Sequence, residues 1–194
     1  MNHYFYYDTS GTYVNNSCFI IENGDKFLSV FLNSKIFRFF KKLNFVAYGD
    51  ANSKGRNKLD ANKMNLVPVP NVANKNKFEE IADSMFSLYE DVNKKRNRFI
   101  KRINSSFEID KLSKKLLSFY SYNFKSFLLE LKKKKVTLNL SQQDEWEEYF
   151  EDYTNEIKII QNRIKELYIN IDQMFYELYG LTEEEIAIVE AATK

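Results

Sequence analysis

The side chains best suited to nucleic-acid chemistry lie in one basic loop, residues 52–65. Cationic and amide side chains alternate in this loop. They are Lys54, Arg56, Lys58 and Lys63, with Asn52, Asn57, Asn62 and Asn65 between them. An amide can pair bidentately with an adenine edge and Arg with a guanine edge, while Lys binds phosphate. The loop therefore predicts contacts to both the bases and the backbone of DNA.

A second group of cations lies just before this loop, in the aromatic segment 27–45. Apolar residues recur there every three to four positions, which predicts one amphipathic helix with its cations on the remaining surface. These cations would enlarge the same basic patch. We therefore predict a set of DNA-contacting residues: Lys54, Arg56, Asn57, Lys58, Asn62, Lys63, Lys41 and Lys42. The alternative interpretation is a plain solvated loop without a ligand.

Residues able to perform catalysis are few. His3 is the one histidine, and the sequence contains no glycine-rich phosphate loop, no Cys/His zinc cluster and no Gly-x-Ser-x-Gly motif. Glu108 and Asp110 are residue types found in metal-dependent nucleases, but their lysine-rich surroundings favour a solvated helix face. The acidic run 144–152 is interpreted as the start of a helix, where the macrodipole favours carboxylates. We expect a binding protein without a catalytic or metal site of its own.

Charge is distributed unevenly along the chain. Residues 1–25 have no Lys or Arg, residues 26–75 hold ten basic and two acidic residues, and residues 76–143 hold fifteen basic and eight acidic ones. Residues 144–194 reverse the balance, with four basic and fourteen acidic residues. Because acidic surface repels a polyanion, nucleic acid is expected on the basic part of the chain.

Composition points to a globular protein. The 194 residues are 44% hydrophobic and 16% aromatic, enough for one or two compact units. Cys18 is the single cysteine, which excludes an internal disulfide, fits a reducing cytoplasm and predicts a small buried apolar filler. No apolar run approaches the roughly 18 residues of a membrane span, and no export signal is evident. We expect a cytoplasmic protein without a membrane partner.

Local patterns predict an α+β fold. In residues 3–25, three short runs rich in Tyr, Phe, Val and Ile alternate with turn signals and predict strands of a small mixed β-sheet. The helix of segment 27–45 would lie on this sheet. Together these elements would form a small N-terminal lobe, followed by long helices.

Pro68 and Pro70, the two prolines of the chain, mark the predicted domain boundary. Each fixes its own φ and disfavours helical geometry at the residue before it, so no helix can cross this point. Residues 1–75 are predicted to be the DNA target recognition lobe, and residues 76–194 a helical spacer. The prolines would set the orientation of the lobe on that spacer.

The spacer shows helical periodicity almost throughout. An amphipathic pattern runs from Phe78 to Ile103, and one or two further helices follow within residues 107–131. The lysine run 132–135 predicts an exposed break. The first long helix is expected to pair antiparallel with the last one, forming a coiled-coil-like arm.

The last helix has the most regular pattern of all. From Trp146 to Leu178, apolar residues alternate four and three positions apart over more than four heptads, the spacing of a coiled coil. Ser141 and Asp144 predict the start of this helix by capping, and Gly180 predicts its end.

Several segments in this order resemble the C-terminal target recognition domain of type IIG restriction-modification enzymes and related adenine-specific DNA methyltransferases, the TaqI-like specificity domain. In that family a helix carries a Leu-Asn-Ser-Lys-like segment, here residues 32–35, and a Leu-Pro-Ile-Pro-like motif closes the recognition region, here residues 67–70. The tail YELYGLTEEEI, residues 176–186, is similar to the C-terminal helices of such enzymes. The resemblance covers nearly the whole chain.

The resemblance implies a reader of a short sequence in double-stranded DNA that directs a methyltransferase, often with a fused endonuclease, to its site. The sequence lacks the Asn-Pro-Pro-Tyr motif and the S-adenosylmethionine glycine motif. We therefore expect a fragment or a specificity subunit that is no enzyme by itself. Its partner would be a methyltransferase or nuclease domain, and S-adenosylmethionine and Mg²⁺ would belong to those catalytic parts.

Two other functions remain open. One is a coiled-coil structural or protein-interaction module that does not bind DNA. The other is a small nuclease that uses Glu108 and Asp110.

Overall fold

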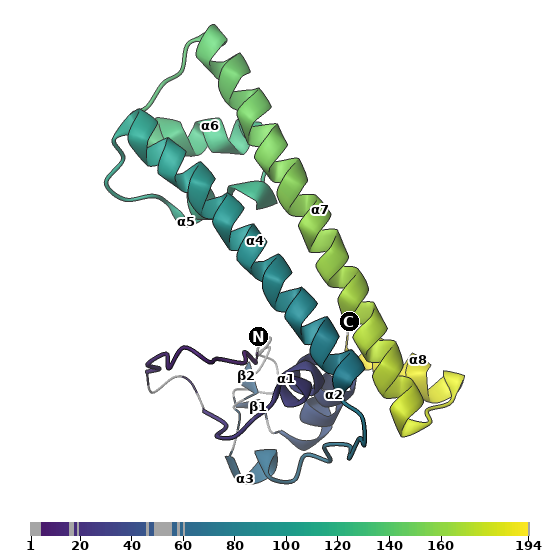
Figure 1. Ribbon diagram of the computed structural model, residues 1–194. Helices are drawn as coiled ribbons and strands as arrows, with labels where there is room; N and C mark the ends of the chain where they lie inside the picture. Colours follow the sequence, from purple (N-terminus) through teal and green to yellow (C-terminus); the bar gives the residue numbers. More distant parts are fainter. Residues whose placement is uncertain are drawn as a thin grey trace. The chain divides into compact units, whose positions relative to one another are not determined.

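The structure is a computed structural model that describes residues 5–15, 18, 20–45, 47–48, 56–57, 59 and 61–193. Most of these residues are helical (Figure 1). The chain divides into two compact units. Unit 1 comprises residues 1–83 and 167–194, and unit 2 comprises residues 84–166. The helices α4, Asn76–Phe107, and α7, Leu140–Tyr179, each contribute to both units.

The predicted α+β fold with a mixed-sheet lobe is wrong. Among the described residues the strands are β1, Ala47–Tyr48, and β2, Arg56–Asn57, which form one two-residue antiparallel pair. The described part of segment 5–25 contains no strand. The backbone of Phe5 instead makes two hydrogen bonds to the side chain of Asn33. The Phe5 N–H donates to Asn33 Oδ1 at 3.2 Å, and Asn33 Nδ2 donates to the Phe5 carbonyl at 2.7 Å.

Several apolar residues of the N-terminal segment are exposed to solvent. Tyr13 is fully exposed and Ile20 is 69% exposed, so no sheet face buries them. Cys18 is exposed as well, and the prediction of a buried thiol is therefore wrong. Strand propensity reflects how well a side chain fits a half-buried pleated surface, and here that surface is not formed.

Two helices stand where one was predicted. α1 spans Lys26–Asn33 and α2 spans Lys35–Asn44. Ser34 lies between them with extended backbone, ψ 161°. Its hydroxyl donates to the Phe31 carbonyl at 2.7 Å and accepts from the Phe37 N–H at 3.3 Å. One buried serine therefore ends the first helix and caps the second, although the apolar spacing continues across it.

The core of unit 1 is aromatic and centres on Phe175 of α7, which is fully buried. Its ring centroid lies 4.9 Å from Phe78 of α4 and 5.3 Å from Phe31 of α1. The short helix α3, Ala61–Met64, and the C-terminal helix α8, Glu183–Ala192, complete the unit. Helix α8 opens with a capping box formed by Thr182 and Glu185.

Unit 2 confirms the predicted antiparallel pairing of the two long helices. Phe107 of α4 contacts Trp146 of α7 at 4.8 Å between centroids, and Lys95 Nζ, three turns earlier on α4, lies 2.8 Å from Glu156 on α7. Two helices and a 3-10 turn complete the unit: α5, Lys114–Leu117, η1, Phe119–Ser121, and α6, Phe124–Lys133. The break after α6 is confirmed, with Lys135 at φ 64°.

The predicted end of α7 at Gly180 is confirmed, whereas its predicted start is wrong. Gly180 has φ 63°, and the N–H of Leu181 bonds the Tyr176 carbonyl at 3.0 Å, as in a Schellman stop. The predicted start is wrong by two residues. Asn139 and Gln142 make the reciprocal capping bonds, at 2.9 and 3.0 Å, that were expected of Ser141 and Asp144.

None of the helices in the described parts of the chain combines the length and the apolarity needed to cross a bilayer.

Candidate nucleic-acid interface

The predicted basic loop lies mostly outside the described residues. Lys54 and Lys58 belong to that part of the chain, while Arg56 and Asn57 are placed as the backbone of β2. Asn62 is exposed on α3. The loop as a DNA-reading surface therefore stays a prediction.

The remaining predicted contact residues make bonds within unit 1. Lys63 Nζ donates to the Asn44 carbonyl at 2.6 Å and lies 5.9 Å from the Phe45 ring centroid. Lys42 Nζ donates to the Ala192 carbonyl of α8 at 3.1 Å. Lys41 is 8% exposed, and burial lowers the pKa of its ammonium group. Lys42 and Lys63 therefore each donate a hydrogen bond to the protein itself, and Lys41 is largely removed from solvent.

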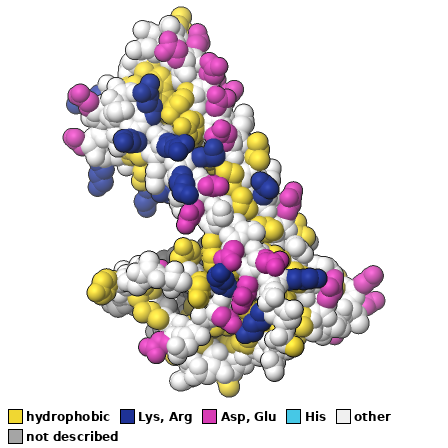
Figure 2. All heavy atoms as spheres, viewed as in Figure 1, with side chains coloured by type: hydrophobic (Ala, Val, Ile, Leu, Met, Phe, Trp, Pro, Cys, Tyr) yellow, Lys and Arg dark blue, Asp and Glu magenta, His cyan; other side chains and the backbone are white. Residues whose placement is uncertain are grey.

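A stronger concentration of positive charge lies on α4 in unit 2. Six of the nine residues from 94 to 102 are Lys or Arg. At 3.6 residues per turn, five of them share one face of the helix. They are Lys94, Lys95, Arg98, Lys101 and Arg102, called here the α4 basic face. Figure 2 shows dark blue side chains gathered where α4 runs in Figure 1.

The members of the α4 basic face differ in how they are paired. Lys94 makes exposed ion pairs with Glu90 and Asp91 of its own helix, and Lys95 pairs with Glu156. In contrast, Arg98, Lys101 and Arg102 are exposed and have no carboxylate within 4.0 Å among the described residues. Three cations on consecutive turns are thus available to an external anion.

The sequence analysis placed this stretch within the amphipathic pattern from Phe78 to Ile103 and did not predict its cations as binding residues. The signal was present, because dense runs of Lys and Arg are typical of nucleic-acid-binding surfaces.

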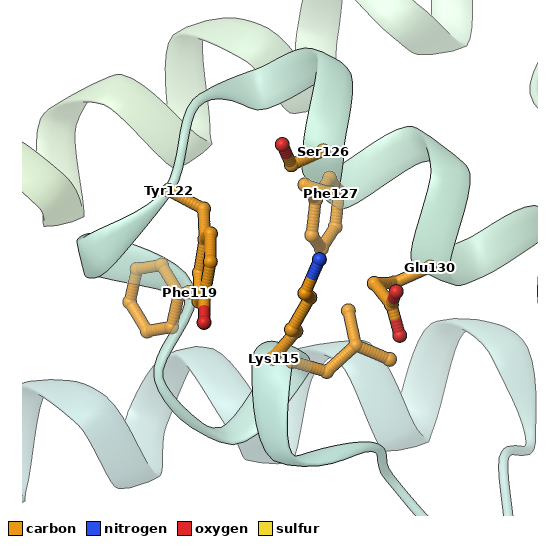
Figure 3. Close-up of a pocket in the computed structure, with 7 residues that line it drawn as sticks. Lys115, Phe119, Tyr122, Ser126, Phe127 and Glu130 are labelled. Atoms are coloured by element: carbon orange, nitrogen blue, oxygen red, sulfur yellow. The ribbon is translucent and has the colours of Figure 1, made fainter.

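A small cavity lies beside α5 and α6 (Figure 3). Its volume is about 10 Å³, close to that of one water-sized probe, so it cannot hold a substrate. Glu130 on its rim is buried and accepts from Ser113 Oγ and Lys133 Nζ, both at 2.7 Å. These bonds lower the pKa of the Glu130 carboxyl. Lys115 lies 5.2 Å from the Tyr122 ring centroid. This cluster stabilises the local fold.

A much larger open hollow lies next to it, between η1 and the start of α6 on one side and α7 on the other. Its volume is about 660 Å³, within the range of ligand pockets. Tyr122 and Ser126, labelled in Figure 3, line both spaces. The α7 side is formed mainly by polar residues on one helix face: Glu151, Thr154, Asn155 and Lys158.

Unit 1 contains a buried charged cluster. Asp172 of α7 is 5% exposed and accepts from the backbone N–H of Lys35, the first residue of α2, at 2.7 Å. Lys35 Nζ contacts Glu190 of α8, which also accepts from the Tyr176 hydroxyl at 2.8 Å. Burial raises the pKa of Asp172 and that of Tyr176. The cluster joins three helices, and we interpret it as structural.

Glu108 and Asp110 follow the end of α4, in the connection to α5, and Glu108 has φ 48°. They do not lie on the helix face that was expected. Within the described ranges, no three His, Cys, Asp or Glu side chains are grouped so that they could hold a metal ion.

Fold and surface together define a helical protein with a strongly basic helix face. The chain belongs to the family described as "Domain of unknown function (DUF8810)", whose model matches residues 71–175. This range includes the α4 basic face and the 660 Å³ hollow. Searches of curated proteins and of solved structures found no match.

Proposed function

We propose that this protein binds double-stranded DNA through the α4 basic face and has a binding role, not a catalytic one. The observation that carries the proposal is the row of three unpaired cations, Arg98, Lys101 and Arg102, on an exposed helix. Side chains three and four residues apart lie about 5–6 Å apart on a helix, so the row can follow a phosphate backbone. Phosphate neutralisation supplies most of the affinity of non-specific DNA binding.

Sequence-specific target recognition for a type IIG-like restriction-modification enzyme is the finer form of the proposal. It is supported by the resemblance of segments 32–35, 67–70 and 176–186, and by the amides of loop 52–65. In this form the amides and the arginine of the loop would read the bases. The partner would be a methyltransferase or nuclease domain, in the cytoplasm.

The test compares two double variants in a duplex-binding titration over a range of salt concentrations. Arg98→Gln/Lys101→Gln removes one Arg and one Lys from the α4 basic face. Arg163→Gln/Lys165→Gln removes the same charges from exposed positions on α7 and is the matched control. Each lost phosphate contact reduces the slope of log K against log salt by about 0.9, so the α4 variant should lose about 2 in slope. The control should retain the wild-type slope.

Two results would overturn the proposal. One is the absence of salt-dependent duplex binding by the full chain, which would favour the protein-interaction module. The other is an equal loss in both double variants, which would show that total charge matters and that the α4 basic face does not. Selection from random duplexes then tests the finer form, because a target-recognition module enriches a consensus sequence and a backbone binder does not.

A further inference from the structure

We infer that the 660 Å³ hollow of unit 2 binds one nucleotide whose base carries an exocyclic amino group. The hollow is lined by residues distinct from the α4 basic face, so this second site goes beyond the proposed duplex binding. The hollow combines an unsatisfied hydroxyl, two opposite charges, and aromatic and amide groups between them.

Thr154 supplies the first observation. Its residue is 4% exposed, and its hydroxyl is buried with no hydrogen-bond partner among the described residues. Buried polar groups in native proteins are nearly always bonded, so an exception calls for a partner that the chain does not provide. Thr154 lines the hollow. The hydroxyl oxygen is not exposed to the hollow in this structure, and the second χ1 rotamer open to a helical threonine would turn it toward a ligand there.

Opposite charges define the two ends of the α7 side. Glu151 and Lys158 both line the hollow, both are exposed, and neither has an ion-pair partner within 4.0 Å among the described residues. They are seven residues apart, or roughly 10 Å along the axis at 1.5 Å per residue. A ligand that fits this wall has a hydrogen-bond donor at one end and an anion at the other.

The middle of the hollow suits a planar ring. Tyr120 is half-buried and Tyr122 is 38% exposed, and both line the hollow with rings that can stack on a nucleobase, as aromatic side chains do in single-stranded recognition. Asn155 lies between the charged ends and can both donate to and accept from a base edge. The ring therefore carries hydrogen-bonding groups on its edge, as a nucleobase does.

A nucleotide combines these properties in one molecule. Its phosphate would bind Lys158, and an amino group of cytosine, adenine or guanine would donate to the Glu151 carboxylate. Pairing of a carboxylate with a cytosine amino group is an established mode of base reading. Uracil and thymine present a carbonyl at that position, and Glu151 would repel it. The site should therefore discriminate CMP from UMP.

The experiment titrates the full chain with CMP, UMP, cytidine and inorganic phosphate, using calorimetry and amide chemical shifts. Wild-type protein should bind CMP about tenfold more tightly than UMP, with shifts at residues 120–126 and 150–158. Glu151→Gln should abolish the preference, since Gln can donate to uracil. Lys158→Gln should weaken the binding of CMP about tenfold and leave the affinity for cytidine unchanged, because cytidine has no phosphate. Glu148→Gln and Lys165→Gln, exposed positions that do not line the hollow, are the matched controls.

Thr154→Val removes the hydroxyl while keeping its shape, and it should weaken CMP binding while the folded protein becomes no less stable. The inference is overturned if CMP binds with Kd above about 1 mM, if shifts map elsewhere, or if Glu151→Gln and Lys158→Gln behave as their controls do. Binding of inorganic phosphate alone, equal in strength to CMP, would also overturn it. Because the titration uses no duplex, its outcome is separate from the test of the α4 basic face.

Discussion

At the residue scale, Asp172 shows how a buried charge is used in this fold. Its carboxylate accepts the first backbone N–H of α2 from a position on α7, and thus caps a helix that lies far away in sequence. Burial is the larger influence and raises its pKa from the usual 3.8, although Lys35 attracts the ionised form. The charge therefore opposes folding while the hydrogen bond supports it.

Two substitutions separate these effects. Asp172→Asn keeps an acceptor oxygen without charge and should leave the free energy of unfolding at pH 7 within about 1 kcal/mol of wild type. Asp172→Ala leaves the part-buried Lys35 N–H without its partner and should lower the free energy of unfolding by about 1–3 kcal/mol. Urea unfolding of both variants is the measurement. Equal losses would show that the charge, and not the hydrogen bond, stabilises α2.

The raised pKa of Asp172 also determines whether the free energy of unfolding rises or falls with pH. Between 3.8 and its folded value, Asp172 binds more protons in the folded state than in the unfolded state. Its contribution is therefore fully present below 3.8 and is lost as pH rises through the folded pKa. Asp172→Asn should remove this decrease from the stability profile.

At the element scale, the break between α1 and α2 depends on Ser34. This residue is fully buried and makes two hydrogen bonds that end one helix and start the next. Ser34→Ala should lower the free energy of unfolding by about 1–2 kcal/mol, because both helix ends lose a partner in an unexposed position. Thermal unfolding measures the change.

The control for Ser34 is Ser105→Ala on α4. Ser105 is exposed, and its hydroxyl bonds the Arg102 carbonyl within the same helix. This change should stay within about 0.5 kcal/mol of wild type. If Ser34→Ala and Ser105→Ala lower the free energy of unfolding equally, the hydrogen bonds of Ser34 do not stabilise the two helix ends.

Elements were predicted well where the signal is local and repeated. The heptads from Trp146 onward and the glycine at 180 specify α7 within a few residues, since both act within one helix. The strands of residues 3–25 were predicted wrongly because a strand needs a partner, and local composition does not provide one. Ser34 was missed because a cap residue can lie on the apolar face without interrupting its spacing.

At the scale of the whole molecule, the candidate site was less predictable than the fold. The α4 basic face could be read from six cations in nine residues, but their pairing depends on which carboxylates α7 brings near, as Glu156 shows for Lys95. The hollow could not be predicted at all. It depends on how η1 and the start of α6 pack beside α7, through Phe119 and Phe124 on Phe150, and no local pattern encodes that packing.

Exposed carboxylates of α7 place negative charge in unit 2 as well. The acidic α7 residues of unit 2 belong to the same compact unit as the α4 basic face, so their field opposes the approach of DNA. Glu147→Gln/Glu148→Gln should therefore raise duplex affinity about threefold in low salt. The gain should fade in high salt, because the screening length shrinks from about 10 Å at 0.1 M to about 3 Å at 1 M.

Fluorescence anisotropy with a labelled duplex at several salt concentrations measures this effect. Glu183→Gln/Glu184→Gln, on exposed residues of α8 in unit 1, changes the net charge equally and calibrates the contribution of total charge. A gain in the α7 variant beyond that of the control would locate the repulsion in unit 2. No gain in low salt, or a gain that persists undiminished in high salt, would contradict an electrostatic origin and with it the assignment of DNA to the α4 basic face.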